Sequence, residues 1–340
     1  MPPTPERPIA SDGGRTTEER TVVTVAICTY NRCELLERTL ASLAELRIPD
    51  DLSWEVVVVD NRCTDATPAV VERAAEGLPV RRVEEPRAGL SHARNRAVEA
   101  AAGEHVIWTD DDVRVSPDWL AAYTRAFRRW PDAAFYGGPL RPLFLGERPD
   151  WLVEGWGAVR GAYPVVDHGE EPFRITGREH LPYGANFAVP AEVLAERAFD
   201  PRLGRSGTDL VGGEETEYLA RLLEEGRTGR WVPGAEVEHV ITRKQQSLDY
   251  VRRYYRDLGR LAEIRRLRDG DAGVPELGGR PRWAWRTAVA AEVRYRLRRM
   301  LAGDPGDWLV DLREASRAQG VLLGPPGAAD ERRREGASGW

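Results

Sequence analysis

The sequence predicts an α/β protein with a doubly wound, mainly parallel sheet, followed by appended C-terminal helices. Four short apolar runs alternate with helical patterns from Thr21 to Asp112, and the alternation stops after Trp130. Strands that alternate with helices at short spacing form parallel sheets, because each connecting helix packs back onto the sheet. A chain of 340 residues with 41% hydrophobic and 31% charged residues can bury one substantial core.

Each element is expected from its own pattern. The apolar, β-branched runs predict strands at 21–27, 54–60, 78–85 and 104–110. Leucines or alanines at helical spacing predict helices at 33–46, 67–77, 91–103, 215–226, 247–267 and 283–301. We expect Thr67 to cap the second helix, with Pro68 at its first position. Residues 131–190 are expected to be irregular walls around a site, and 269–282 a flexible linker.

The net charge and the cysteine spacing argue against a nucleic-acid-binding protein and against a zinc-finger site. The net charge of −6 gives no general attraction to nucleic acid, so we expect no nucleic-acid partner. The three cysteines form no CxxC pair and no zinc-finger spacing. Neither an apolar leader nor a run of about 20 apolar residues is present, so we expect a cytoplasmic protein.

Acidic and turn residues follow three of the expected strands: CTYNR, DNRCTDAT and TDDD. Ligands of open parallel sheets bind at the carboxyl ends of the strands, where these segments meet. The consecutive Asp110, Asp111 and Asp112 repel one another unless a cation neutralises them. Oxygen ligands favour Mg2+ or Mn2+. The alternative is an acidic turn before a helix that starts near Ser116.

Four ordered segments carry a resemblance to a known family: VTVAICTYNR, VVVVDNRCTDAT, GLSHARNRAVEAAAGEHVIWTDDD and GGEETEYLARLLEEG. Together they resemble family 2 glycosyltransferases of the GT-A fold, over roughly residues 22–259. The resemblance implies a nucleotide diphosphate-sugar donor, usually a UDP-sugar, a bound divalent metal (Mn2+ or Mg2+), and inversion at the anomeric carbon. It also implies a division into a nucleotide-sugar-binding half at 21–130 and an acceptor half at 131–246. A helical extension at 247–320 and disordered tails at 1–20 and 321–340 complete the expected organisation.

The resemblance assigns the donor-site residues one by one. Asp60 would read the base by accepting the uracil imide proton. Asp110 would lie near the ribose and the metal, Asp112 would bind the metal, and Asp111 could take either role. His239 resembles a late histidine that serves as an additional metal ligand, although a lone histidine is often structural. The other expected donor-site residues are Thr29, Tyr30 and Arg32 on the first loop, and Gly89 and Arg94 at the third helix.

A carboxylate pair before a helix is the expected catalytic group. The family has a Glu-Asp pair whose Asp takes the acceptor proton, and here the pair is Glu214-Glu215. We expect Glu215 to be the general base, with Glu214 as the alternative. Both acids would also favour the positive end of the helix.

The acceptor side is less specific. Asn186 could bond a hydroxyl group, Gly184 permits close backbone approach, and Trp151 or Trp156 could stack on a sugar. Carbohydrate, lipid-linked and small-molecule acceptors all fit. The loop that carries Arg243 and Lys244 could close on the diphosphate.

The arginine-rich helices at 250–267 and 283–301 have two explanations. They pack on the catalytic core with a solvated basic face, which we favour, or they give a peripheral contact with the inner face of a membrane. For the whole chain, a nucleotidyltransferase and a non-catalytic nucleotide-sugar-binding scaffold are the alternatives to a glycosyltransferase. The first would require a glycine-rich basic loop, which CTYNR is not.

Overall fold

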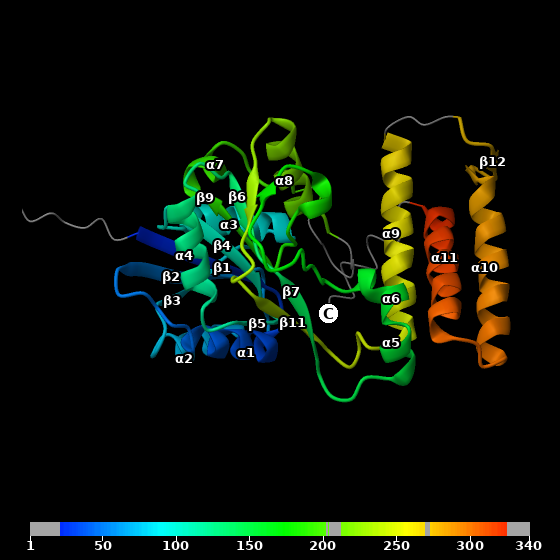
Figure 1. Ribbon diagram of the computed structural model, residues 1–340, viewed down its shortest axis with the longest axis horizontal. Coiled ribbons are helices and arrows are strands. Elements are labelled where there is room, and N and C mark those ends of the chain that lie inside the picture. The colour runs from blue at the N-terminus through cyan, green and yellow to red at the C-terminus, as the bar shows by residue number, and fades with distance from the viewer. Residues whose placement is uncertain (1–20, 202, 204–211, 269–272, 325–340) are drawn as a thin grey trace, which may run out of the picture.

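The computed structural model describes residues 21–201, 203, 212–268 and 273–324. The tail predicted at 1–20 lies outside these ranges, and of the tail predicted at 321–340 only residues 321–324 lie inside them. The described chain forms an α/β body and a bundle of long helices that stand side by side (Figure 1).

The body is built on a sheet with the strand order β3-β2-β1-β4-β9-β6-β10-β8 in the described residues. Strands β1 to β4 are mutually parallel, whereas β9 runs antiparallel to both β4 and β6. The prediction of a doubly wound, mainly parallel sheet is confirmed. The strand bounds are β1 Thr21–Thr29, β2 Leu52–Asp60, β3 Val80–Glu84, β4 His105–Asp110, β6 Phe135–Gly137, β8 Arg174–Ile175, β9 Asn186–Pro190 and β10 Gly229–Trp231.

Helices cover both faces of this sheet, because successive side chains of each strand point to opposite faces. Val56 and Val58 of β2 pack in one core with α1 and α2, whereas Val57 and Val59 pack in a second core with α3 and α8. A run of four valines therefore contributes to two cores. The helices are α1 Cys33–Ala44, α2 Thr67–Ala74, α3 Leu90–Ala100, α4 Trp119–Arg129, α7 Ala191–Ala195 and α8 Glu214–Glu224.

The start of α2 differs from the prediction. Thr67 is not the N-cap residue but the first residue of the helix. The N-cap residue is Ala66, whose side chain cannot accept a hydrogen bond from the helix. The carboxylate of Asp65 instead accepts hydrogen bonds from the Thr67 amide at 3.1 Å and the Thr67 hydroxyl at 2.7 Å. An Asp side chain can bond the backbone two residues ahead, and this local competition decided the geometry.

A second, smaller sheet crosses the edge of the body. Its strand order is β5-β11-β7, with β5 Val113–Val115, β7 Leu140–Phe144 and β11 Val237–Ile241. The antiparallel pairing of β11 with β5 places His239 opposite Val113. A histidine far along the chain is thereby fixed directly beside the acidic run that precedes β5.

The region predicted to be irregular contains short elements. They include α5 Asp150–Glu154, α6 Trp156–Val159, and two 3-10 turns, η1 Arg160–Ala162 and η2 Arg178–His180. The ring of Trp156 packs against Phe144 and Tyr163, with centroids 5.5 and 5.3 Å apart. Trp156 is therefore part of the packing that joins this region to the helical bundle.

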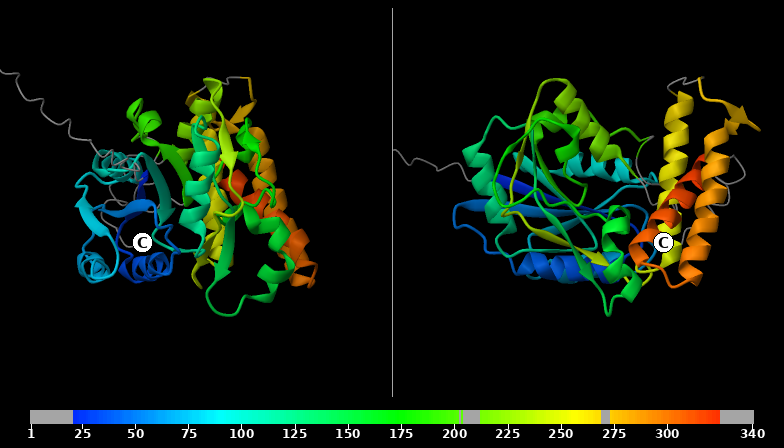
Figure 2. Two further views of the ribbon diagram at one scale, coloured as in Figure 1. Left: turned by 60° about the vertical axis from the view of Figure 1, so that its left-hand side comes forward. Right: turned by 45° about the vertical axis from the view of Figure 1, so that its right-hand side comes forward.

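Three helices form the bundle: α9 Leu248–Arg268, α10 Arg282–Met300 and α11 Pro305–Leu323. Helix α11 lies between α9 and α10, and α10 is the outermost (Figures 1 and 2). A core that includes Val251, Trp308 and Leu309 joins α9 and α11 to α5 and α6 of the body. The favoured explanation of the first basic helix, packing on the catalytic body, is confirmed for α9.

Glycines set the contact between α9 and α11. A Cβ atom at Gly259 would lie 2.0 Å from the Arg317 carbonyl oxygen, and one at Gly320 would lie 2.0 Å from the Arg256 carbonyl oxygen. The two backbones therefore touch where these glycines face each other. Such close approach is possible only without side chains.

Two features of this region differ from the sequence prediction. Helix α11 was not predicted as a separate helix, since the sequence indicated only a helical extension at 247–320. It also continues beyond residue 320 and ends at Leu323. The predicted linker at 269–282 contains a small hairpin of β12 Glu276–Leu277 and β13 Arg280–Pro281 in its described part. In the ranges given above, no helix combines the length and the apolar character needed to cross a membrane.

Candidate active site

The candidate site lies at the carboxyl edge of the main sheet. The parallel register pairs Thr29 with Asp60 and Cys28 with Asp110, so three predicted site residues end neighbouring strands. This shared edge follows from the sheet topology, since parallel strands terminate on the same side. Burial raises the pKa of Cys28 to about 12, which keeps this thiol protonated at neutral pH.

The three consecutive aspartates point to different partners. Asp111 and Asp112 are buried, whereas the side chain of Asp110 is 38% exposed. Asp111 accepts hydrogen bonds from the Thr29 hydroxyl and from Arg32, both at 2.7 Å. The same guanidinium reaches Asp112 at 2.8 Å, so Arg32 bridges two of the three carboxylates.

Burial and like charge act together on this run. Burial raises the pKa of Asp111 above its ordinary value, Arg32 opposes that shift, and the Asp112 carboxylate adds to it. Holding Asp111 and Asp112 ionised side by side therefore requires positive charge. Arg32 supplies part of that charge from the loop after β1.

Asp110, Asp112 and His239 form a cluster of possible metal ligands. One ligand atom from each lies within 4.8 Å of the others, as a shared divalent ion requires. The Nε2 atom of His239 lies 3.1 Å from Asp112 Oδ1 and 4.0 Å from Asp110 Oδ2. Burial lowers the pKa of His239, but the two carboxylates outweigh burial and raise it above the ordinary value. Two carboxylates and an imidazole are a set of side chains that could hold a divalent metal ion.

Backbone contacts hold this cluster in place. The amide of Val240 donates to the Asp112 carbonyl oxygen at 2.8 Å, next to the pairing of His239 with Val113. Asp111 does not belong to this cluster, and its two carboxylate oxygens instead accept hydrogen bonds from Thr29 and Arg32. The geometry thus groups Asp110 with Asp112 and gives Asp111 a different environment.

Asp60, the last residue of β2, is a third buried carboxylate at the edge, and the residue is 4% exposed. Its Oδ1 accepts from the Cys63 amide at 2.7 Å, and its Oδ2 accepts from Arg82 at 2.8 Å. Both contacts fix the orientation of the carboxylate at the end of β2. Tyr30, half-buried, lies on the neighbouring loop after β1.

Two asparagines tie the loops together and were not predicted. Asn31, with φ of 51°, accepts from the Thr64 amide at 2.7 Å and so joins the first loop to the second. Asn61 donates to the carbonyl oxygens of Glu85 and Arg87 at 3.0 and 2.6 Å, and accepts from the Gly89 amide at 3.0 Å. Both lie within the motifs CTYNR and DNRCTDAT, where an Asn beside a strand end is a turn signal.

Gly89 is the residue before α3, and its φ of 124° is in the region that favours glycine. This conformation lets the chain turn from the loop held by Asn61 into the helix. The predicted position of Gly89 at the start of the helix agrees with the structure.

Arg94 and Glu214 form a buried ion pair between α3 and α8. The Arg94 Nε lies 3.1 Å from Glu214 Oε1, and the two side chains are 3% and 1% exposed. Burial would lower the pKa of Arg94, but Glu214 and Glu215 outweigh it and raise the pKa. The guanidinium also lies over the ring of Phe187, 5.3 Å from its centroid.

The two glutamates therefore have different environments. Glu214 is buried in the ion pair, whereas the next residue, Glu215, is half-buried at the first turn of α8. A Cβ atom at Gly184 would lie 2.5 Å from Arg94 Nη2 and 3.4 Å from Glu215 Cδ. The predicted Gly184, Arg94 and the glutamate pair thus meet at one place.

The prediction that Asn186 bonds an acceptor hydroxyl is wrong. Its side-chain oxygen accepts from Trp119 and Tyr123, both at 2.9 Å. Its amide nitrogen donates to the carbonyl oxygens of Pro139 and Ala235 at 2.9 and 2.7 Å. All four hydrogen bonds that an Asn side chain can make are used, and the residue is fully buried. Asn186 is a structural link between β9, α4 and the second sheet.

The remaining predicted residues lie at the border between the body and the bundle. Trp151 is half-buried on α5. Arg243 and Lys244 are exposed on the loop after β11, where the Arg243 guanidinium lies over Gly146.

Comparison with known proteins identifies the family. The model of the family Glycosyl transferase family 2 matches residues 24–196, just over half of the chain. The chain belongs to glycosyltransferase family 2. It is thus a glycosyltransferase, as the resemblance implied, and the family assignment favours this class over a nucleotidyltransferase.

Two curated relatives span most of this glycosyltransferase. The succinoglycan biosynthesis protein ExoM of Rhizobium meliloti is 29% identical over 273 residues, which cover 79% of this chain and 80% of that protein. The glucosyl-dolichyl phosphate glucuronosyltransferase of Haloferax volcanii is 27% identical over 239 residues, which cover 67% and 72%.

Two solved structures share the fold. Residues 1–349 of S. aureus TarS in complex with UDP align with a TM-score of 0.52 and 16% identity, over 93% of this chain and 92% of that one. The mannosyltransferase PcManGT from Pyrobaculum calidifontis, in complex with GDP-Man and Mn2+, aligns with a TM-score of 0.51 and 23% identity, over 93% and 79%. The predicted GT-A fold is confirmed.

Proposed function

We propose that this glycosyltransferase moves a sugar from a UDP-sugar to an acceptor hydroxyl, with a divalent metal and with inversion at the anomeric carbon. The observation that carries the proposal is the cluster of Asp110, Asp112 and His239 at the sheet edge. A divalent ion bound there would stabilise the negative charge that grows on the departing diphosphate. TarS with UDP and PcManGT with Mn2+ share the fold in which we place this chemistry.

The chain's own groups support the donor in this proposal. Asp60, oriented by the Cys63 amide and Arg82, accepts the uracil imide proton. Thr29, Tyr30 and Arg32 lie on the loop beside the base, and Gly89 lies on the loop that approaches the diphosphate. Arg32 keeps Asp111 and Asp112 in position by bridging them.

Glu215 is the proposed general base. Glu214 is committed to Arg94 in a buried pair, and removing a proton would require that carboxylate to leave its partner. Glu215 is more exposed and lies next to Gly184. Its carboxylate takes the proton of the acceptor hydroxyl as the oxygen attacks the anomeric carbon. The bond from that carbon to the diphosphate oxygen breaks in the same step, and this single displacement inverts the centre.

Arg94, which the sequence analysis placed among the donor-site residues, is proposed here as a positioning residue instead, because its guanidinium is buried in the ion pair with Glu214. It fixes Glu214 at the first residue of α8, and through it the direction of Glu215. The acceptor itself is a carbohydrate, a lipid-linked sugar or a small molecule that presents a hydroxyl group at this place.

Calorimetry tests the metal and the nucleotide together. UDP, GDP and TDP would be titrated into the protein with and without Mn2+, and we expect Mn2+ to tighten UDP binding about tenfold or more. Equal UDP affinity in the two buffers would refute the metal site. UDP-sugar hydrolysis in the same buffers separates an enzyme from a non-catalytic scaffold, since a scaffold would bind the donor without consuming it.

A further inference from the structure

The outer face of α10 is a surface that the active site does not use. Seven large apolar side chains along it and just after it are 44–75% exposed: Trp283, Trp285, Val289, Val293, Leu297, Met300 and Leu301. Four of them, at positions 285, 289, 293 and 297, are one turn apart and so share one face of the helix. Exposed apolar groups that line up in this way mark an interaction surface.

The opposite face of the same helix already accounts for its packing. Ala284, Ala288, Ala291 and Tyr295 are buried against the rest of the bundle. The small alanines bring α10 close to α11, its neighbour in the bundle (Figure 2). The outer apolar side chains are therefore not needed for the packing of this helix.

Positive charge accompanies the apolar face. Helix α10 carries six arginines, and three of them are paired with the carboxylates of Glu292 on the same helix or of Asp311 and Glu314 on α11: Arg294, Arg296 and Arg298. Arg282 and Arg286 are exposed beside Trp283 and Trp285, and neither has an acidic partner among the residues that the structure describes. Long arginine side chains can reach away from buried apolar groups while keeping the charged end at a polar surface.

The hairpin of β12 and β13 continues this surface. Leu277 at its turn is 59% exposed, and the Trp285 indole donates to the Leu277 carbonyl oxygen at 3.2 Å. The tryptophans, the leucine and the two unpaired arginines thus gather at one end of α10. Tryptophan and arginine together are the residues that favour the headgroup layer of a bilayer.

We propose that the outer face of α10 docks this protein on an anionic lipid surface. In that arrangement the helix lies in the plane of the membrane, with Val289, Val293 and Leu297 in the headgroup–acyl boundary and the arginines at lipid phosphates. A second copy of the chain fits less well, because two α10 helices side by side would bring arginines against arginines. The proposal is independent of the metal site.

Vesicle sedimentation of the full chain tests the proposal. We expect binding to vesicles of equal parts phosphatidylglycerol and phosphatidylcholine, and much weaker binding to phosphatidylcholine alone. The double variant Val289→Glu/Val293→Glu should weaken binding by about tenfold or more. The variant Arg282→Gln/Arg286→Gln should weaken it by about fivefold for each arginine removed.

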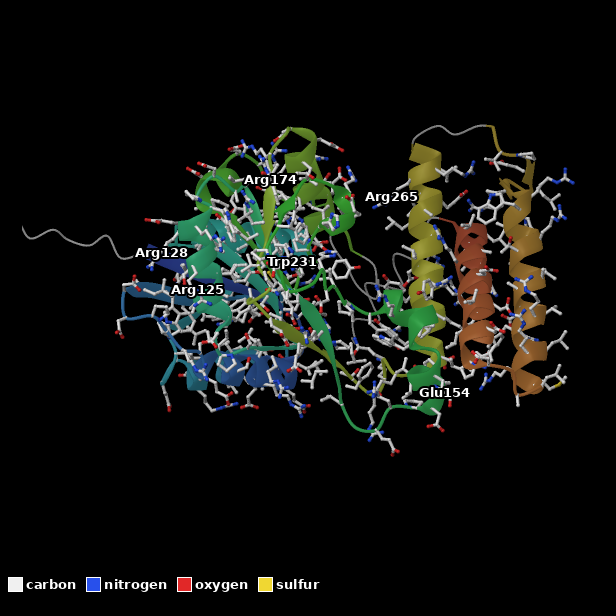
Figure 3. The ribbon with its side chains drawn as sticks, in the orientation of Figure 1. Arg125, Arg128, Glu154, Arg174, Trp231 and Arg265 are labelled. Carbon is white, nitrogen blue, oxygen red and sulfur yellow. The ribbon has the colours of Figure 1, made fainter. Side chains whose placement is uncertain are left out.

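Matched controls separate docking from general effects. Val153 on α5 is 48% exposed, close to the 50% of Val293, so Val153→Glu adds one carboxylate outside α10 and is compared with the single variant Val293→Glu. Arg125 is exposed on α4, on the opposite side of the molecule from the bundle (Figure 3), and Arg125→Gln removes one positive charge there, as the single variant Arg286→Gln does on α10. Both controls should bind vesicles as the unchanged protein does, and all variants should keep the circular dichroism spectrum.

Two results would overturn the proposal. One is vesicle binding that the α10 variants leave unchanged, or that is equal on neutral and anionic vesicles. The other is a dimer in analytical ultracentrifugation that Val289→Glu/Val293→Glu dissociates, which would make the face a contact between two copies.

Discussion

The sheet edge and the outer helix of the bundle use the same residue type in opposite ways. At the edge, Arg94 and Arg32 have side chains 3% and 34% exposed and hold the carboxylates of Glu214, Asp111 and Asp112. On α10, the side chain of Arg296 is 75% exposed. Burying an ion pair costs free energy of desolvation, so it persists where the position of the charges matters. The difference teaches that an arginine bonded to buried carboxylates fixes the positions of those carboxylates, whereas an exposed arginine such as Arg296 can meet solvent or a partner.

The two regions also differ in the interactions that hold their own segments together. At the sheet edge, charge and hydrogen bonds fix side chains from distant segments, as in the contacts of Arg32 with Asp111 and Asp112. Between α9 and α11, the glycines at 259 and 320 let two backbones touch. Substitutions in the metal-ligand cluster should therefore change catalysis, whereas substitutions in the buried Arg94–Glu214 pair or in the glycine contact should change stability.

The largest effect is expected at Asp112. The variant Asp112→Asn keeps the size of the side chain but removes the charge from the cluster with Asp110 and His239. Transfer should fall by about a hundred- to a thousandfold in buffer saturated with Mn2+, and UDP binding should no longer respond to the metal. Steady-state kinetics and calorimetry measure the two effects.

A control aspartate lies close in sequence. Asp118 is half-exposed and paired with Arg47 on the surface, so Asp118→Asn should leave transfer unchanged. Full activity of Asp112→Asn in metal-replete buffer would mean that the cluster is not the catalytic metal site.

The next largest effects are expected at the glutamate pair. We expect the substitution of Glu215 to change catalysis and the substitution of its neighbour Glu214 to change stability. Glu215→Gln should lower kcat by about a hundredfold or more, with the thermal stability nearly unchanged, because a general base contributes about that much. Glu214→Gln should instead destabilise the fold by about 3 kcal/mol, because it leaves the buried Arg94 without its charged partner. Thermal denaturation and initial rates, measured on both variants, separate the roles. The reverse pattern would assign the base to Glu214.

The glycine contact of the bundle is expected to be purely structural. Gly259→Ala places a methyl group against the Arg317 carbonyl oxygen, so α9 and α11 must move apart, at a cost of about 3 kcal/mol. Gly157→Ala on α6 is the matched control, since no atom lies within 4 Å of the added carbon. Urea denaturation should show a lower midpoint for Gly259→Ala alone. If both variants unfold at the same urea concentration, the close contact does not hold the bundle together.

Much of the sheet edge could be predicted because its signals are local. The four consecutive valines at 56–59 predict a strand that is buried on both faces of the sheet, and Asp60 directly follows them. The same holds for the run 106–112, in which apolar residues precede three aspartates. Strand order then brings these ends together through the general rules of parallel sheets.

What the sequence could not provide depends on long-range contacts. The hydrogen-bond partners of Asn186 lie between 47 and 67 residues away from it in the sequence. No local pattern around Asn186 predicts these partners. The bridge from Arg32 to Asp111 spans 79 residues in the same way. Helix α11 is a different case, because Asp304 caps it at the Gly306 amide and Pro305 begins it, so its local start signal was present.

The smallest effect is expected at His105, which lies at the opposite end of β4 from Asp110. Its ring stacks on Phe127 at 3.9 Å, and burial lowers its pKa from 6.5 to about 4. The unfolded chain therefore takes up a proton at His105 below about pH 6.5, whereas the folded chain does so only near pH 4. Stability should fall as the pH drops through this window.

The variant His105→Phe removes the titrating group while keeping an aromatic ring on Phe127. The loss of unfolding free energy between pH 7 and pH 5 should shrink by about 1–2 kcal/mol relative to the unchanged protein. Urea denaturation at the two pH values measures the difference, and transfer activity at pH 7 should not change, since His105 is at the far end of the strand from the acidic cluster. An identical pH dependence in both proteins would show that His105 titrates normally in the fold. In that case, the acid sensitivity of the fold would come from other titratable groups, such as Glu55, Asp65 and Glu85, whose pKa values the fold lowers.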